Sequence, residues 1–145
     1  MSLAARVEQR FRDEHQPVLS AVVECANATA GGFDARHAGR PATTTPDRIT
    51  EPLRRRLEQT GALAACPTVL ESLVSAAGAS LSAPPVAAPP YVVIASSGPV
   101  LRATLPRSRL VVSVRVFETR HTDDGVRYVR TDHPPDEPPI RIEFR

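Results

Sequence analysis

Lysine and tryptophan are absent from this sequence, and aromatic residues of any kind are scarce. Its 145 residues include four Phe and two Tyr, although 41% of the residues are hydrophobic. This length is typical of one domain, and the hydrophobic fraction is sufficient for one core. The core therefore has to be built mainly from Val, Leu, Ile and Ala, and a ligand pocket lined by aromatic rings is not expected.

An excess of charge of one sign is also lacking. The 18 basic side chains are all Arg, the acidic side chains number 16, and the formal net charge is +2. A net charge this small does not by itself indicate a polyanionic partner. The arginine-rich, lysine-free composition therefore does not single out nucleic acid as a partner.

Long apolar runs are missing as well. The first sixteen residues carry charge throughout, and the most apolar window, 86–95, contains two prolines and is too short to cross a bilayer. Cys25 and Cys66 lie in helical, apolar surroundings and form no CxxC pair, which favours buried free thiols over a disulfide. These features predict a cytoplasmic protein with no membrane contact.

Motifs for cofactors and nucleophiles are absent. Gly31–Gly32 lacks the GxGxxG spacing, a phosphate loop would need Lys, and Ser96–Gly98 is better interpreted as a turn than as a GxSxG elbow. Cys25 with His15 or His37 could form a nucleophile and base, but Cys25 lies on the buried side of its helix, without a basic group nearby in sequence. We therefore expect no cofactor and assign no catalytic residue.

Proline divides the chain into two halves. Ten of the fifteen prolines lie between residues 84 and 139, mostly as adjacent pairs that exclude helix and central strand. Apolar spacing is helical before residue 80 and alternates after residue 90. We expect a single domain, 1–145, with a helical half (1–78), an extended proline-rich connector (79–90) and a β half (91–145).

About three helices are expected in the first half. Apolar residues recur every three or four positions over residues 3–29, and Pro17 either kinks this helix or divides it in two. Two further helices are expected at 50–60 and 67–78. Residues 31–48 show no periodicity, which is typical of a loop.

The second half predicts an antiparallel sheet of five strands. Short links between the strands favour a meander, packed on one face by the helices. In the longest strand, Val111 and Phe117 are expected on the outer face. The predicted fold class is α+β, with N-terminal helices packed on a C-terminal five-stranded antiparallel sheet. The five strands are expected at 91–96, 100–105, 109–119, 126–130 and 140–145.

Residues 49–118 carry a resemblance to a known family. They contain ITEPLRRRLEQTGALAACPTVLESLV, then APPYVV and SSGPVLRATL, then RLVVSVRVFE. This part of the chain resembles small uncharacterised proteins of halophilic archaea. Because that family has no assigned activity, the resemblance implies no catalytic residues and an unknown function.

One group of residues has the composition of a metal site. Carboxylates and imidazoles could hold a divalent ion if two loops came together. Against this, Asp124–Gly125 is typical of a hairpin corner, and no HxxxH or HExxH spacing is present. The candidate metal ligands are His121, Asp123, Asp132 and His133.

Two arginine groups could contact nucleic acid. Arg54–Arg56 opens a helix-turn-helix-like segment, but the next helix would expose Thr, Glu and Ser in place of base-reading side chains. A solvated, salt-paired helix face is therefore favoured there. The strands offer the better candidate, since outward Arg side chains could lie along a phosphate backbone. These residues are Arg102, Arg109, Arg115, Arg127 and Arg141.

The sequence favours a non-enzymatic interaction or regulatory module over an enzyme. We expect a protein partner or a second copy of the chain, because a homodimer would cover Val111 and Phe117 on the long strand. Nucleic-acid-backbone binding through the Arg-lined sheet face is the first alternative; Phe117 is the only stacking ring available to it. A small metal-dependent enzyme using residues 121–133 is the second.

Overall fold

In the computed structural model, which describes residues 1–145, the chain forms four helices and two four-stranded antiparallel sheets. The expected α+β class is confirmed, but the prediction of three helices on one five-stranded sheet is wrong. The helices are α1 (Leu3–Glu14), α2 (Gln16–Ala30), α3 (Asp47–Thr60) and α4 (Ala62–Ala76). The strands are β1 (Ala35–His37), β2 (Arg40–Thr43), β3 (Val92–Ala95), β4 (Gly98–Thr104), β5 (Arg109–Val114), β6 (Phe117–Thr122), β7 (Gly125–Arg130) and β8 (Ile140–Phe144).

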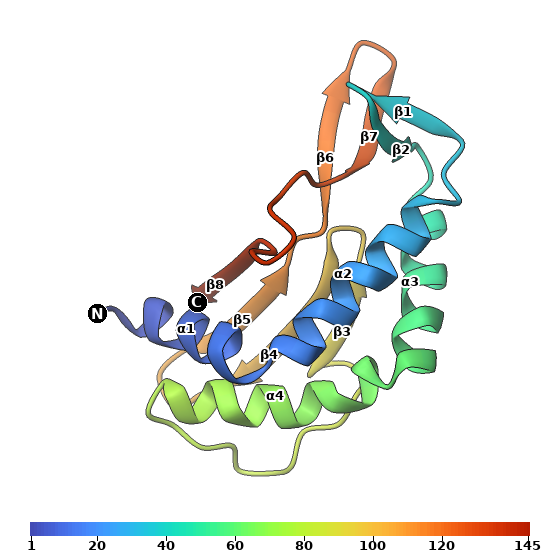
Figure 1. Ribbon diagram of the computed structural model, residues 1–145. Coiled ribbons are helices and arrows are strands. Elements are labelled where there is room, and N and C mark those ends of the chain that lie inside the picture. Colours follow the sequence, from blue (N-terminus) through green and yellow to red (C-terminus); the bar gives the residue numbers. More distant parts are fainter.

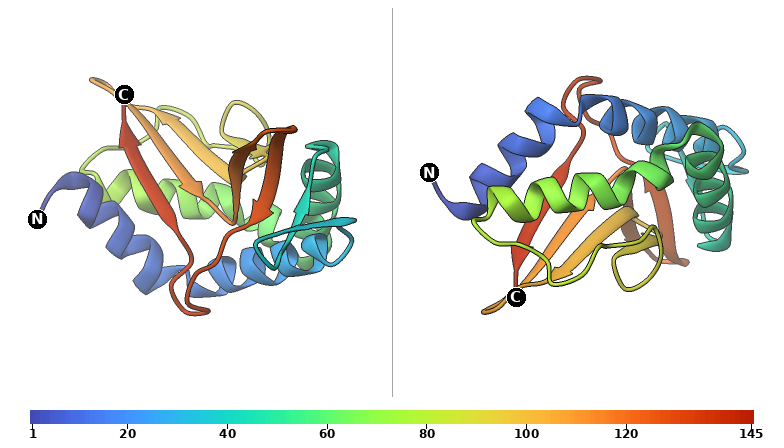
Figure 2. Two further views of the ribbon diagram at one scale, coloured as in Figure 1. Left: turned by 90° about the horizontal axis from the view of Figure 1, so that it is seen from above. Right: turned by 90° about the horizontal axis from the view of Figure 1, so that it is seen from below.

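The two sheets differ in their surroundings. One has the strand order β3-β4-β5-β8, and the helices lie against one of its faces while no helix covers the other (Figure 1, Figure 2). The second has the order β1-β2-β7-β6 and lies at one end of the molecule (Figure 1). A single cluster of 27 buried residues joins side chains from all four helices and both sheets. None of the helices combines the length and the hydropathy needed to cross a membrane.

Pro17 breaks the first helix instead of kinking it. α1 ends at Glu14, His15 stands between the helices, and Pro17 lies in the first turn of α2, where a missing N–H is tolerated. Ser2 Oγ accepts a hydrogen bond from the Ala5 amide at 3.0 Å and so caps α1. The helical half therefore contains four helices where about three were expected.

Gly61 separates α3 from α4 with no intervening loop. It adopts a left-handed conformation (φ +82°), which reverses the chain at the end of α3. α4 begins directly at Ala62, five residues before the predicted start at residue 67. Because Leu70, Leu73 and Val74 are fully buried, α4 is a core helix.

The predicted strand 109–119 is divided between the two sheets. After β5, the Val116 amide donates to the Val114 carbonyl oxygen at 3.1 Å, forming a tight turn. This kink shifts the side-chain alternation by one residue, so that Val116 and Phe117 are both fully buried. The expectation that Phe117 lies on the outer face is therefore wrong.

Residues 31–48, expected to form a loop, contain the β1–β2 hairpin. Its turn places Ala38 and Gly39 at positive φ, as tight hairpin turns require. β2 pairs with β7 through Ala42 opposite Val129 and Thr43 opposite Tyr128. Strands of three and four residues are too short to show an alternating pattern, and their partner strand is remote in sequence.

Gly98 approaches the kink so closely that it has no room for a side chain. A Cβ atom there would overlap the Val114 carbonyl oxygen, and the φ of Gly98, +135°, is rarely adopted by other residues.

We expect Gly98→Ala to lower the free energy of unfolding by ~3 kcal/mol, measured by urea denaturation. Gly125→Ala is the matched control, because Gly125 has a similar φ of +122° and open space around it. Equal losses in both variants would show that the overlap is unimportant.

The burial of His15 should make the free energy of unfolding depend on pH. Its Nε2 atom is buried without a hydrogen-bond partner. Burial lowers the pKa of His15, opposed by Glu14 and assisted by Arg10. Below the unfolded-state pKa of ~6.5 the unfolded chain then binds more protons than the folded one, so stability should fall as pH drops from there towards the lowered pKa. Urea denaturation between about pH 5 and 7 should show that His15→Phe loses part of this dependence; an unchanged pH profile would contradict it.

Candidate functional site

The uncovered face of the β3-β4-β5-β8 sheet gathers arginine. Along each strand alternate side chains point to opposite faces. Leu101, Leu110 and Val112 point into the core, and the intervening positions point outward. We call the arginines of the outward set the arginine face. Register places Arg102, Arg109, Arg141 and Arg145 on it. Arg115 follows the end of β5, where its amide bonds the Pro139 carbonyl oxygen, and its charge acts on Glu143, so we include it. The face thus contains four of the five arginines predicted as nucleic-acid contacts.

Strand pairing brings these side chains close together. Arg109 and Arg145 are directly opposite and exchange two backbone hydrogen bonds of 2.8 and 2.9 Å. Arg141 faces Ser113 across the same pair of strands, and Arg102 lies on β4 beside β5. Neighbouring strands are about 4.8 Å apart and alternate residues about 6.7 Å apart along a strand. The arginine face is therefore one continuous cationic patch.

Glu143 is the single acid on this face. Arg145 Nε donates to its Oε2 atom at 2.8 Å, Arg145 Nη2 forms an ion pair with the same oxygen at 2.8 Å, and Arg141 pairs with the other oxygen. The hydrogen bond from Arg145 lowers the pKa of Glu143, with further help from the charge of Arg141. Five Arg against one Glu give the face a charge of +4, whereas the whole chain carries +2. The rest of the molecule is therefore net negative.

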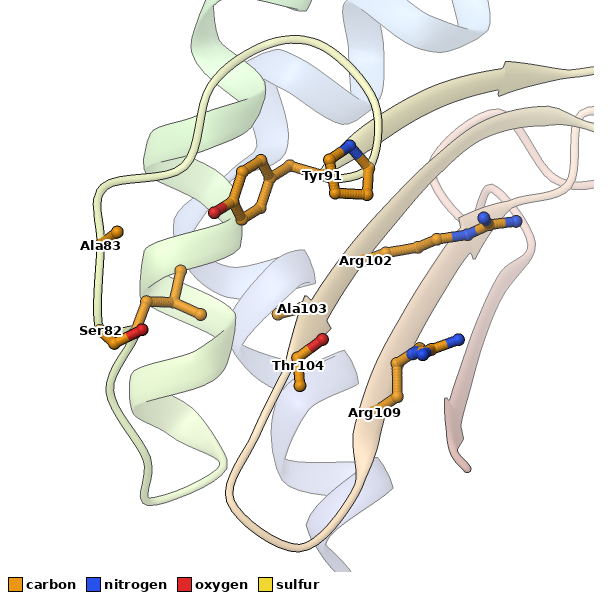
Figure 3. Close-up of a pocket in the computed structure, with 9 residues that line it drawn as sticks. Ser82, Ala83, Tyr91, Arg102, Ala103, Thr104 and Arg109 are labelled. Atoms are coloured by element: carbon orange, nitrogen blue, oxygen red, sulfur yellow. The ribbon is translucent and has the colours of Figure 1, made fainter.

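Three arginines of the face have no carboxylate partner. Arg102, Arg109 and Arg115 make no ion pair within the chain. Arg102 and Arg109 line a shallow hollow of about 390 Å³ beside the connector. Figure 3 shows their side chains projecting side by side, while the Tyr91 ring turns away from them towards the side of Ser82. The free guanidinium groups are thus available to an external ligand.

Arg127 lies apart from the arginine face. It is in β7, opposite Arg120 of β6, and its Nη1 atom donates to the Arg36 carbonyl oxygen at 3.5 Å. The Arg54–Arg56 triplet is on α3. The following helix, α4, is packed in the core, so α4 cannot enter a DNA groove as a recognition helix would.

The four predicted metal ligands are not brought together. His121 pairs with Val126 near the tip of the β6–β7 hairpin, and Asp123 lies in its turn. Asp132 and His133 follow the opposite end of β7. No three His, Cys, Asp or Glu side chains of the chain are grouped as metal ligands would be.

The thiols have no catalytic surroundings. Cys25 is 3% exposed, and its Sγ atom lies 3.8 Å from Thr60 Oγ1, with no hydrogen bond to His15 or His37. Burial raises the pKa of Cys25, and it raises the pKa of Cys66 to about 11. Both are free, as the sequence predicts, and protonated at neutral pH.

Arg130 is the functional candidate that sequence reasoning missed. It is 9% exposed, and its Nε atom donates to Asn27 Oδ1 at 3.0 Å. Its Nη1 atom donates to the carbonyl oxygens of Val116 at 3.0 Å and Thr131 at 2.9 Å. Alternation along β7 places Arg130 on the inward face beside Tyr128, but nothing in the sequence indicates that its contacts come from α2 and from the kink.

Comparisons with known proteins give a family but no activity. No curated protein and no solved structure matches the chain. Residues 5–145 match a family described as a domain of unknown function, DUF7988. This match agrees with the uncharacterised family expected from the sequence. Because it spans nearly the whole chain, the protein belongs to the DUF7988 family.

Proposed function

We propose that the protein is a non-enzymatic interaction module that binds the phosphate backbone of nucleic acid through the arginine face. The observation that carries the proposal is the concentration of five Arg and one Glu on a sheet face that no helix covers. Guanidinium groups match phosphate in geometry and charge, and they can donate two parallel hydrogen bonds to it. An extended patch, in contrast to a closed pocket, suits an extended polyanion.

The same face lacks the groups that read bases. Phe117 is fully buried in the core, and Tyr91, which lines the hollow with Arg102 and Arg109, turns its ring away from them (Figure 3). No aromatic ring therefore lies among the arginines for stacking. Ser113 and Thr104 are the small polar side chains between them. Binding is therefore expected to depend on charge and to vary little with nucleotide sequence.

Self-association through the long strand is less well supported. β5 lies between β4 and β8, so its backbone has no free edge for pairing with another copy. Val111 is 5% exposed, between Arg102 and Glu143, whose aliphatic stems can cover it. Stacking two arginine faces would also bring like charges together. The homodimer remains a prediction that light scattering can test.

Removing a phosphate contact should reduce the salt dependence of binding. We expect Arg102→Ala and Arg109→Ala each to lower the slope of log K against log salt concentration by ~1. The measurement is fluorescence anisotropy with single- and double-stranded oligonucleotides, starting at ~50 mM salt. Arg55→Ala on α3 is the control. Arg55 is exposed, and its substitution removes the same charge at a position away from the sheet. Absence of binding by the unmodified protein at low salt would refute the proposal.

Removing the single acid should have the opposite effect. Glu143→Gln releases Arg141 and Arg145 and raises the charge of the face, so we expect tighter oligonucleotide binding and a slope steeper by about 1. Glu58→Gln is the control, since it removes the same charge from an exposed position on α3, away from the sheet. Equal gains from both variants would mean that net charge, and not the arginine face, determines affinity.

A further inference from the structure

A second polar site lies away from the arginine face, between α2, β2 and the segment that follows β7. It is a pocket of about 260 Å³. Pockets for drug-sized ligands are roughly 300–1,000 Å³, so this one suits a small ion or a single chemical group. Its polar lining comes from Asn27, Arg40, Arg130, Thr131, Asp132 and His133.

Arg130 is a buried cation without a counter-ion. All its acceptors are neutral, being two backbone carbonyls, Asn27 Oδ1 and His133 Nε2, and no carboxylate lies within ion-pair distance. Burial lowers the pKa of Arg130. An unpaired buried charge is costly, and proteins normally compensate it with an opposite charge. Here the chain does not supply one.

The guanidinium group retains one free nitrogen. Nε and Nη1 have partners, whereas Nη2 has none within the chain and is not sealed from solvent. His133 must accept from Nη1, since Arg only donates, and its Nδ1–H then donates to the Pro134 carbonyl oxygen at 2.8 Å. His133 is therefore a lone-pair acceptor for Arg130 in this hydrogen-bond arrangement, and it supplies no negative charge.

Further donors surround the same pocket. Asn27 uses its carbonyl oxygen for Arg130, which leaves its Nδ2 donor free. Arg40 binds the Arg130 carbonyl oxygen at 3.3 Å and Glu118 at 2.9 Å. Thr131 Oγ1 is buried without a partner. Asp132 is the one acid of the lining and is exposed at the rim. In this pocket, hydrogen-bond donors of the side chains therefore outnumber the acceptors that the chain provides for them.

We propose that this pocket binds a phosphate group, with Arg130 Nη2 and Asn27 Nδ2 as its principal donors and Arg40 at its edge. The group can belong to free inorganic phosphate or to a small phosphate ester, since both present the same oxygens. The site is independent of the arginine face, because Arg130 points inward towards α2 and is on the other sheet.

Asn27→Asp tests the proposal by supplying the missing counter-ion inside the chain. The new carboxylate would sit 3.0 Å from Arg130 Nε with the same shape as the amide. Calorimetric titrations with inorganic phosphate and with glycerol phosphate, at matched ionic strength in chloride, are expected to show binding to the unmodified protein by at least one of them. The Asn27→Asp variant should bind at least about tenfold more weakly. Ala28→Asp, one residue along α2, is the control for net charge and should bind unchanged.

A second variant keeps the test independent of folding. Asp132→Asn removes the rim acid from an exposed position and should tighten binding of the same ligand several-fold. Arg102→Ala with Arg109→Ala should leave it unchanged, which separates this site from the arginine face. Failure of both phosphate compounds to bind, or equal binding by the Asn27→Asp variant, would overturn the proposal.

Discussion

The kink between β5 and β6 separates the two sheets and brings together the segments that form both candidate sites. Gly98 leaves no side chain between β4 and the Val114 carbonyl, so the two strands can approach closely enough for the chain to turn. The Phe117 amide then donates to the Ser97 carbonyl oxygen at 3.0 Å, and the Thr131 amide to that of Val116 at 2.9 Å. A shift of one residue thereby directs β6 into a second sheet.

The same shift determines the chemistry of the arginine face. With Phe117 in the core, the outer face keeps its arginines and loses its one candidate stacking ring. What remains is a cationic patch without a stacking ring, and under the proposed function it would recognise charge in a partner and not the identity of a base. Glu143 moderates this patch by pairing two of the five arginines, which leaves the other three without an acid.

The junction also creates the phosphate pocket. Arg130 donates to the buried carbonyl oxygen of Val116, which lies at the kink, and Asn27 of α2 accepts from the same guanidinium. Residue types alone pointed to a cation at Asp132 and His133, because carboxylates and imidazoles are metal ligands. The structure instead places the buried guanidinium of Arg130 beside these two residues, and His133 accepts a hydrogen bond from it. The expected ligand is therefore an anion and not a metal cation.

Local elements with patterns long enough to recognise could be predicted from the order of the residues. Periodicity located the helical segments and most strands of the β half, although it gave five strands where six occur, and Pro17 indicated a kink or a break near residue 15. Alternation indicated four arginines of the face. The division into two sheets, the burial of Phe117 and the partners of Arg130 could not be predicted in this way. Those features depend on contacts between remote segments: a hairpin too short for periodicity completes the second sheet, and Gly98 admits a one-residue shift that strict alternation cannot reveal.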